Sequence, residues 1–377
     1  MYSTNNYLIK KGISVPWKIQ PIFKQKFSHA MVIPCLNEYE QLPILLKSIE
    51  KNGSLILKNI IIIIVINNSE TDSKIIKCNN KKTYELLINN SFDFTIGIID
   101  AFSMKLELPK KYAGVGFARK IGMDLALPYL TDDNSLIFST DADSIINKNY
   151  FKIIINHFNK TQIQAAVVKF KHIETNDKSI KKQIIKYEKF LKTTANKMKA
   201  SGSPYGYVSM GSTMICTVKA YVSIGGMPKK KATEDFYFLQ ELSKYCGVKT
   251  INKTLVYPSS RLENRIYLGT GYRMIEAQKG FNINSLFYSD DAFYYLKKWL
   301  TIGTSSWKLD FHELFKKTNN IDLELTNYII NENIKDILPK LQTSSPSKIH
   351  FINQFHRWFD GLKTIRFLKF FTKISTP

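Results

Sequence analysis

Seven consecutive β-branched residues, all isoleucine or valine, occupy positions 60–66. A run without polar alternation is typical of a central strand in a parallel sheet, which is buried on both faces. Shorter apolar segments expected to be strands lie at 30–34, 94–99, 136–139, 165–170 and 213–217. Segments with helical spacing of apolar residues occur at 37–49, 116–127, 180–198 and 233–245. Strands and helices that alternate in this way predict an α/β fold, with a mostly parallel sheet flanked by helices.

Beyond residue 281 the sequence suits helices alone. We therefore expect an N-terminal extension at 1–27, a sheet-based domain at 28–270 and a helical C-terminal region at 271–377. An apolar fraction of 44% in 377 residues allows a large core and excludes a disordered chain. The run 60–66 is far shorter than the ~20 residues of a membrane-spanning helix, and the Lys-rich N-terminus lacks the apolar stretch of a secretory signal.

The composition limits the compartment and the partners. The four cysteines, Cys35, Cys78, Cys216 and Cys246, lie far apart and form no metal-binding or redox motif, so we expect a reduced, cytoplasmic location. A formal charge of +23 is compatible with nucleic acid, with an anionic membrane surface, or with a general enrichment in Lys, Asn and Ile. Because the basic residues are spread along the chain without a nucleic-acid-binding motif, we expect no nucleic-acid partner.

Two aspartates follow the expected strand at 136–139, in the segment Asp141-Ala142-Asp143. The carboxyl end of a strand is where an α/β fold binds its ligand. Two carboxylates so close together repel each other unless a cation lies between them. Mg²⁺ is typically held by one or two carboxylates together with substrate phosphates. The segment therefore predicts a metal site for Mn²⁺ or Mg²⁺, although Asp-x-Asp also occurs in ordinary turns.

The segment is one of five motifs in a characteristic order. Two strand ends precede it, at 32–38 and 64–72, then a glycine-containing helix start at 114–122, and the acidic pair Glu234-Asp235 follows it. This ordered set resembles the family 2 glycosyltransferases with the GT-A (nucleotide-diphospho-sugar transferase-like) fold, over about residues 28–250. The resemblance implies a transferase that takes a sugar from a nucleotide-sugar donor.

The resemblance also implies roles for individual residues. The two strand ends would form the nucleotide pocket, with contacts from Pro34, Leu36, Asn37, Glu38, Asn67 and Asn68. Asp141 would face the ribose and the metal, and Asp143 would ligate Mn²⁺ or Mg²⁺. Arg119 is expected near the base or the phosphates, since a planar guanidinium suits phosphate. Arg261 and Arg265 are candidates to clamp the diphosphate.

The pair Glu234-Asp235 is the expected catalytic pair. In the family the second acid of such a pair at a helix start commonly removes the acceptor proton, which makes Asp235 the candidate general base of an inverting transfer. The same residues also suit an ordinary helix N-terminus, where acids interact favourably with the helix dipole.

Two departures from the family pattern affect the expected substrate. Asn67-Asn68 stands where many members have two aspartates, which leaves the donor base open, with UDP the preferred carrier. The Gln-x-x-Arg-Trp motif of processive synthases is absent, so we expect a single transfer.

Three other classes of protein share parts of this pattern. A dinucleotide oxidoreductase is rejected, because no strand leads directly into Gly114 and Arg119 stands where the third glycine of that motif would be. A nucleotidyltransferase-like enzyme lacks the expected Gly-rich loop near the N-terminus. A basic binding module on an inactive transferase fold is disfavoured by the presence of both acidic motifs.

The C-terminal segment 343–377 interleaves basic residues with aromatic and aliphatic ones at helical spacing. Such a helix suits either a membrane interface or packing on a protein core, and we favour packing. We therefore expect a cytoplasmic enzyme, with the inner face of the membrane as a second location through 343–377. Its partners would be a nucleotide-sugar donor and a glycan or lipid-linked acceptor in the synthesis of surface glycans or glycolipids.

Overall fold

The computed structural model describes residues 3–262 and 269–375. The chain divides into two compact units. Unit 1 comprises Met1–Ile185 and Ser209–Phe281, and unit 2 comprises Lys186–Val208 and Asn282–Pro377. Each unit is described by itself below.

Unit 1 is built on one nine-stranded sheet with the order β1-β4-β3-β2-β5-β8-β7-β9-β6. The strands are β1 Ile19–Gln20, β2 His29–Cys35, β3 Ile60–Asn67, β4 Thr95–Ala101, β5 Leu136–Ser139, β6 Ile145–Ile146, β7 Ala165–Phe170, β8 Met214–Thr217 and β9 Lys249–Tyr257. Strands β2, β3, β4, β5, β7 and β9 share one direction, whereas β1, β6 and β8 run against their neighbours. The expected class, an α/β fold with a mostly parallel sheet, is confirmed.

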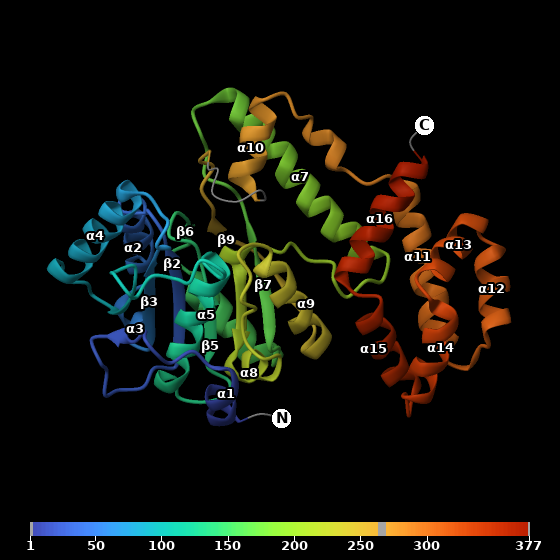
Figure 1. The fold of residues 1–377 in the computed structure, drawn as a ribbon, viewed down its shortest axis with the longest axis horizontal. Coiled ribbons are helices and arrows are strands. Elements are labelled where there is room, and N and C mark those ends of the chain that lie inside the picture. The colour runs from blue at the N-terminus through green and yellow to red at the C-terminus, as the bar shows by residue number, and fades with distance from the viewer. Residues whose placement is uncertain (1–2, 263–268, 376–377) are drawn as a thin grey trace. The chain divides into compact units, whose positions relative to one another are not determined.

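Helices cover both faces of this sheet. Besides part of α7 Lys178–Ala200, the helices of unit 1 are α1 Thr4–Lys11, α2 Leu42–Glu50, α3 Ser54–Leu57, α4 Lys74–Asn89, α5 Val115–Ala126, α6 Tyr150–Thr161, α8 Val218–Ser223, α9 Glu234–Cys246 and α10 Thr270–Gln278. Figure 1 shows α2 and α4 on one side of β2 and β3 and α5 on the other, as right-handed crossovers require. All eight residues of β3 are buried, which confirms the strand expected from the isoleucine run.

Helix α5 packs closely on the centre of the sheet. Its Gly122 has no room for a side chain, since an added Cβ would lie 2.8 Å from Cγ2 of Val65 and still closer to Val32. This close approach fixes the start of α5, and with it Arg119, over the strands that lead to the site.

The N-terminal residues belong to unit 1. Tyr7 of α1 donates a hydrogen bond to Oδ1 of Asp124 at 2.8 Å, and Tyr221 donates to the same atom at 2.6 Å. Lys120 donates to Oδ2 of Asp124 at 2.8 Å, and all four residues are at most 3% exposed. A fully paired buried network of this kind anchors α1 on α5 and α8.

Unit 2 is helical, as expected for the C-terminal region. Part of α7 Lys178–Ala200 joins α11 Asp290–Ser305, α12 Phe311–Asn319, α13 Leu323–Asn331, α14 Ile334–Thr343, α15 Lys348–Trp358 and α16 Gly361–Ser375. Its core centres on Trp299, which is fully buried and makes ring contacts with Phe355 and Phe359.

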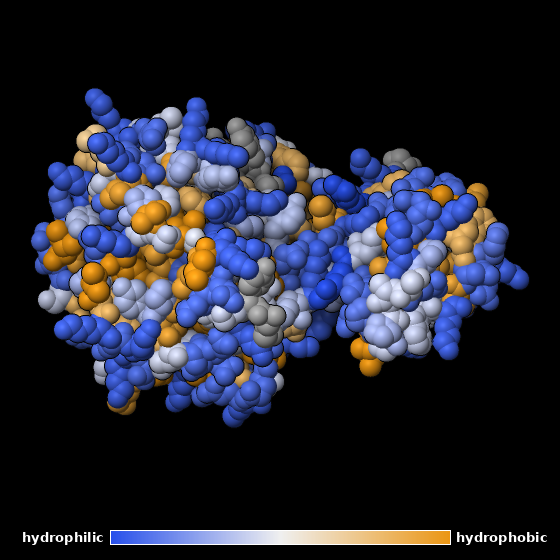
Figure 2. All heavy atoms as spheres, turned by 60° about the horizontal axis from the view of Figure 1, so that its bottom comes forward, coloured by the Kyte–Doolittle hydropathy of each residue, from blue (hydrophilic) through white to orange (hydrophobic). Residues whose placement is uncertain are grey.

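The aromatic stripe of the segment 343–377 lies in this core. Phe351, Phe355, Phe359, Phe367 and Phe371 are at most 1% exposed. In the sequence, the helical spacing of these aromatic residues favoured packing on a protein core over a membrane interface, and the structure places them in such a core. Hydrophilic side chains dominate the face of the molecule shown in Figure 2, and no helix among the described residues is long and apolar enough to cross a membrane.

Candidate active site

Three parallel strands end at one edge of the sheet in unit 1. Cys35 of β2 pairs with Ile66 of β3, and Ser139 of β5 pairs with Val32 of β2. The loops that follow these strands therefore begin at the same edge. This is the edge at which α/β folds bind their ligands.

The two aspartates after β5 lie in a tight turn. The N–H of Ser144 donates to the carbonyl oxygen of Asp141 at 3.0 Å, and Ala142 between the aspartates is buried. The side chains of Asp141 and Asp143 keep 35% and 21% of their surface exposed. Both carboxylates therefore remain accessible at the sheet edge.

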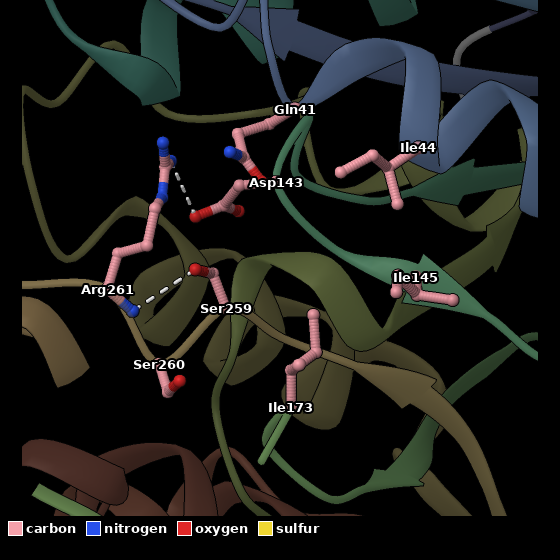
Figure 3. Close-up of a pocket in the computed structure, with 8 residues that line it drawn as sticks. All are labelled: Gln41, Ile44, Asp143, Ile145, Ile173, Ser259, Ser260 and Arg261. Carbon is pink, nitrogen blue, oxygen red and sulfur yellow. Dashed lines mark hydrogen bonds and ion pairs between the residues drawn. The ribbon is translucent and has the colours of Figure 1, made fainter. Parts of the chain in front are cut away.

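A cavity of about 240 Å³ adjoins this turn. It is lined by residues from four parts of unit 1: Gln41, Ile44, Asp143, Ile145, Ile173, Ser259, Ser260 and Arg261. Figure 3 shows the side chains of Asp143 and Arg261 turned toward one another, with Ile145 and Ile173 across the hollow. The cavity thus combines an acid and a guanidinium with an apolar wall.

Arg261 connects two expected site residues. Its Nη2 donates to both carboxylate oxygens of Glu38, at 2.8 and 3.0 Å, and to Oδ2 of Asp143 at 3.1 Å. Glu38 is only 5% exposed. The structure thus brings together the end of β2, the turn after β5 and the segment after β9. The other expected clamp, Arg265, lies outside the described residues.

Arg119 makes a second set of ion pairs. Its Nη2 pairs with Oδ1 of Asp141, its Nη1 pairs with Oε1 of Glu234, and its Nε donates to Oγ of Ser139 at 3.1 Å. Arg119 is 2% exposed, so its guanidinium lies beneath the site rather than at its surface. All three of these partners are protein groups, and the expected contact with base or phosphates stays a prediction.

Helix α9 begins with the expected catalytic pair. Thr233, in a left-handed conformation, is its N-cap, and Glu234 and Asp235 form the first turn. Glu234 is 3% exposed. Burial raises the pKa of Glu234 to about 7; the nearby negative charge of Asp235 adds to this rise, whereas Arg119 opposes it.

Asp235 is half-buried, and its Oδ1 accepts the N–H of Phe236 at 2.7 Å. Loss of hydration raises the pKa of Asp141; the charges of Asp143 and Asp235 raise it further, and Arg119 opposes the rise. Asp235 therefore lies within electrostatic reach of Asp141.

An asparagine that the sequence interpretation missed ties the two nucleotide-pocket loops together. Asn80 of α4 is fully buried, and its Oδ1 accepts the N–H of Asn37 at 2.9 Å. Its Nδ2 donates to the carbonyl of Asn67 and to Oδ1 of Asn68, both at 3.0 Å. Asn37 has a φ of 58°, a left-handed conformation that Asn tolerates better than most residues. No local signal marked Asn80, because the sequence did not predict the helix that carries it.

The glycines at the start of α5 have a packing role. A Cβ on Gly114 would lie 2.7 Å from Cα of Lys231, and one on Gly116 would lie 2.7 Å from Cβ of Glu234. Both glycines thus let the segment before α9 pass close to α5. This contact supports the rejection of a dinucleotide motif.

The carboxylates at this edge of the sheet suit a divalent cation that also binds phosphate. Among the described residues, no three His, Cys, Asp or Glu side chains gather in a ready-made metal site. Five carboxylates nevertheless surround two guanidiniums at the sheet edge: Glu38, Asp141, Asp143, Glu234 and Asp235, with Arg119 and Arg261. This excess of negative charge favours a cation, and two partly exposed carboxylates suit Mn²⁺ or Mg²⁺ bound together with a diphosphate.

Comparison with known proteins gives matches only among solved structures, since no protein-family model and no curated protein matches the chain. The similar structures are GT-A-type glycosyltransferases. One is S. aureus TarS 1-349 in complex with UDP-GlcNAc, 13% identical over 88% of this chain and 90% of that chain, with a TM-score of 0.44.

Two further structures are similar to the chain at the same level. The mannosyltransferase PcManGT from Pyrobaculum calidifontis, in complex with GDP-Man and Mn²⁺, is 10% identical over 94% of this chain and 92% of that chain, with a TM-score of 0.42. Glucosyl-3-phosphoglycerate synthase from Mycobacterium tuberculosis, in complex with Mn²⁺, UDP-glucose and phosphoglyceric acid, is 11% identical over 74% of this chain and 85% of that chain, with a TM-score of 0.37. Similarity at this level says nothing about the substrate of this chain.

Proposed function

We propose that the protein is a metal-dependent glycosyltransferase that moves one sugar from a UDP-linked donor to a hydroxyl group of an acceptor. The observation that carries the proposal is the row of charged side chains at the carboxyl edge of the sheet. Glu38, Arg261 and Asp143 form one part of the row. Asp141, Arg119 and Glu234 form the other, and Asp235 follows on α9.

Each part of the row has a proposed task. Asn67 and Asn68 hold the base, and Asp141 faces the ribose. Asp143, with Asp141, holds Mn²⁺ or Mg²⁺, which when bound stabilises the departing diphosphate as a Lewis acid. Arg261 is 32% exposed and lines the cavity, where its guanidinium is proposed to bind a phosphate oxygen.

Asp235 is the proposed general base. As the acceptor hydroxyl oxygen forms its bond to the sugar carbon, the bond from that carbon to the diphosphate oxygen breaks. The hydroxyl proton passes to a carboxylate oxygen of Asp235. A single displacement of this kind inverts the configuration at the sugar carbon. The proposed acceptor is a glycan or lipid-linked glycan that receives one sugar per encounter.

A panel of nucleotide sugars with Mn²⁺ tests the proposal. A ligand at a hundred times its Kd adds about 2.7 kcal/mol of stability. This gain corresponds to a rise of roughly 5 °C in the midpoint of thermal unfolding for a unit of this size. We expect such a rise with a UDP-sugar and Mn²⁺, and slow hydrolysis of the same donor.

The alternatives give different results in the same panel. A nucleotidyltransferase-like enzyme would respond to a nucleoside triphosphate and release pyrophosphate. A basic binding module would bind polyanions in a salt-dependent manner without any turnover. Either result, together with no response to any nucleotide sugar, would refute the proposal.

A further inference from the structure

The buried guanidinium of Arg119 links the turn after β5 to the start of α9. One nitrogen pairs with Asp141 and another with Glu234, although these acids are 93 positions apart in the sequence. The third nitrogen is fixed by Ser139, the last residue of β5. The partners of this guanidinium therefore lie in two segments. One is the end of β5 with the turn that carries the proposed metal ligands, and the other is the start of α9, which carries the proposed base.

We propose that Arg119 is a positioning residue that holds the Asp141–Asp143 turn and the first turn of α9 in one fixed arrangement. This inference rests on the proposed function. It assigns Arg119 no contact with the donor, which distinguishes it from the phosphate role expected from the sequence.

The surroundings of Arg119 keep its side chain in one place. It is 2% exposed, and Gly211 lies against its guanidinium. A Cβ at residue 211 would lie 2.5 Å from Cζ of Arg119 and closer still to Nη2. A side chain at residue 211 would therefore clash with the guanidinium, and the glycine leaves room for it.

The arrangement of the three partners favours the planar guanidinium of an arginine over the ammonium group of a lysine. A guanidinium presents several donors at fixed angles, so it can hold two carboxylates and a hydroxyl at once. A lysine at this position would supply the charge without the fixed geometry. Because Glu234 and Asp235 are neighbours in the same helical turn, fixing Glu234 also fixes the backbone from which Asp235 projects.

Measuring Mn²⁺ affinity distinguishes a positioning role from a simple charge effect, because the two predict opposite changes in affinity for Arg119→Met. If Arg119 acted only as a nearby positive charge, Arg119→Met would remove a repelling charge and Mn²⁺ would bind more tightly. If Arg119 positions Asp141, the same variant binds Mn²⁺ more weakly despite that loss of repulsion. We expect Mn²⁺ affinity, measured with UDP present by electron paramagnetic resonance, to fall about five- to tenfold, as for other couplings between sites.

The variant is also expected to slow transfer at saturating Mn²⁺ and donor. A displacement of about 1 Å at a catalytic group can cost roughly a hundredfold in rate. Arg119→Lys should recover less than a tenth of this loss. Gly211→Ala provides a second variant that displaces the guanidinium without changing any charge, and it should weaken Mn²⁺ binding in the same direction.

Lys120→Met is the matched control. Lys120 lies next to Arg119 in α5, is 3% exposed, and bonds Asp124 and Tyr7 rather than an acid of the candidate site. Its loss should destabilise the protein while Mn²⁺ affinity stays within twofold of wild type. If Mn²⁺ affinity fell as much in Lys120→Met as in Arg119→Met, general destabilisation would explain both results. That outcome would overturn the inference.

The failures are distinguishable. If wild-type protein binds neither Mn²⁺ nor UDP, the proposed function fails and the inference fails with it. If wild type binds both, and Arg119→Met and Gly211→Ala leave Mn²⁺ affinity unchanged or raise it, the positioning role alone is overturned.

Discussion

Protonation of His29 should make unit 1 lose stability in mild acid. His29 begins β2, and its Nδ1 accepts the backbone N–H of Leu136 in β5 at 3.0 Å. An imidazole that accepts at Nδ1 is neutral, with its proton on Nε2. Burial lowers the pKa of His29 from 6.5 to about 4, against a smaller opposing effect of Asp132. The hydrogen bond and the burial therefore both favour the neutral form in the folded state.

The sign and size of the effect follow from this shift. The unfolded chain binds a proton near pH 6.5 whereas the folded chain binds it near pH 4, so stability falls as the pH drops through this window. The difference of 2.5 between the two pKa values corresponds to about 3.4 kcal/mol once the pH is well below 4. At pH 5 the loss relative to neutral pH is about 2 kcal/mol.

The variant His29→Asn isolates this contribution. Asn keeps an acceptor oxygen close to the position of Nδ1 but does not titrate. Urea unfolding at pH 7.5 and pH 5 should show that the variant loses about 2 kcal/mol less than wild type between these two values. Equal losses in the two proteins would refute the assignment of His29 as a buried neutral acceptor.

Four further predictions concern the site and the two cores. Asp143→Ala should abolish Mn²⁺-dependent turnover of the donor, and retained turnover would exclude Asp143 as a metal ligand. Asp235→Asn should leave donor binding within about threefold of wild type and remove transfer, whereas near-normal transfer would rule out Asp235 as the base. Gly116→Ala should displace the start of α9 and lower stability by about 1–3 kcal/mol, as overpacked sites commonly do; an unchanged unfolding midpoint would contradict this. Phe355→Ala should cost about 3–5 kcal/mol, because Phe355 is fully buried beside Trp299; calorimetry should show the loss in unit 2.

The sheet was largely predictable because its strands carry their signal locally. Each residue of β3 is apolar up to Asn67 and buried, so no knowledge of its neighbours was needed. Helix α4 was missed for the opposite reason. Two of its three buried side chains, Asn80 and Thr83, are polar, so its buried face has no apolar period. Strand β9 was also missed, because lysines and threonines occupy most of its exposed positions.

The elements that carry the candidate site residues were predictable, whereas the pairings between these residues were not. The motifs located Asp141, Asp143, Glu234 and Asp235 correctly at the ends of β5 and the start of α9. Which cation pairs with which acid depends on how distant segments meet. Arg119 reaches Glu234 over 115 positions and Arg261 reaches Glu38 over 223, and no local pattern reports such contacts.

The two arginines are the same residue type, but the structure holds them differently. A guanidinium at the edge of a nucleotide-sugar pocket suggests phosphate binding in both cases, yet the two side chains differ in burial. Arg119 is 2% exposed and bonded through all three nitrogens, so moving it toward a ligand would leave two acids and a hydroxyl without their donor. Such a loss is costly for buried groups. The Arg261 side chain is 32% exposed at the cavity, so a phosphate oxygen could approach its guanidinium without moving it away from Glu38 and Asp143. We therefore expect Arg261→Gln to weaken donor binding and Arg119→Met to weaken the metal site. Variants that affected both kinds of binding equally would contradict this division of roles.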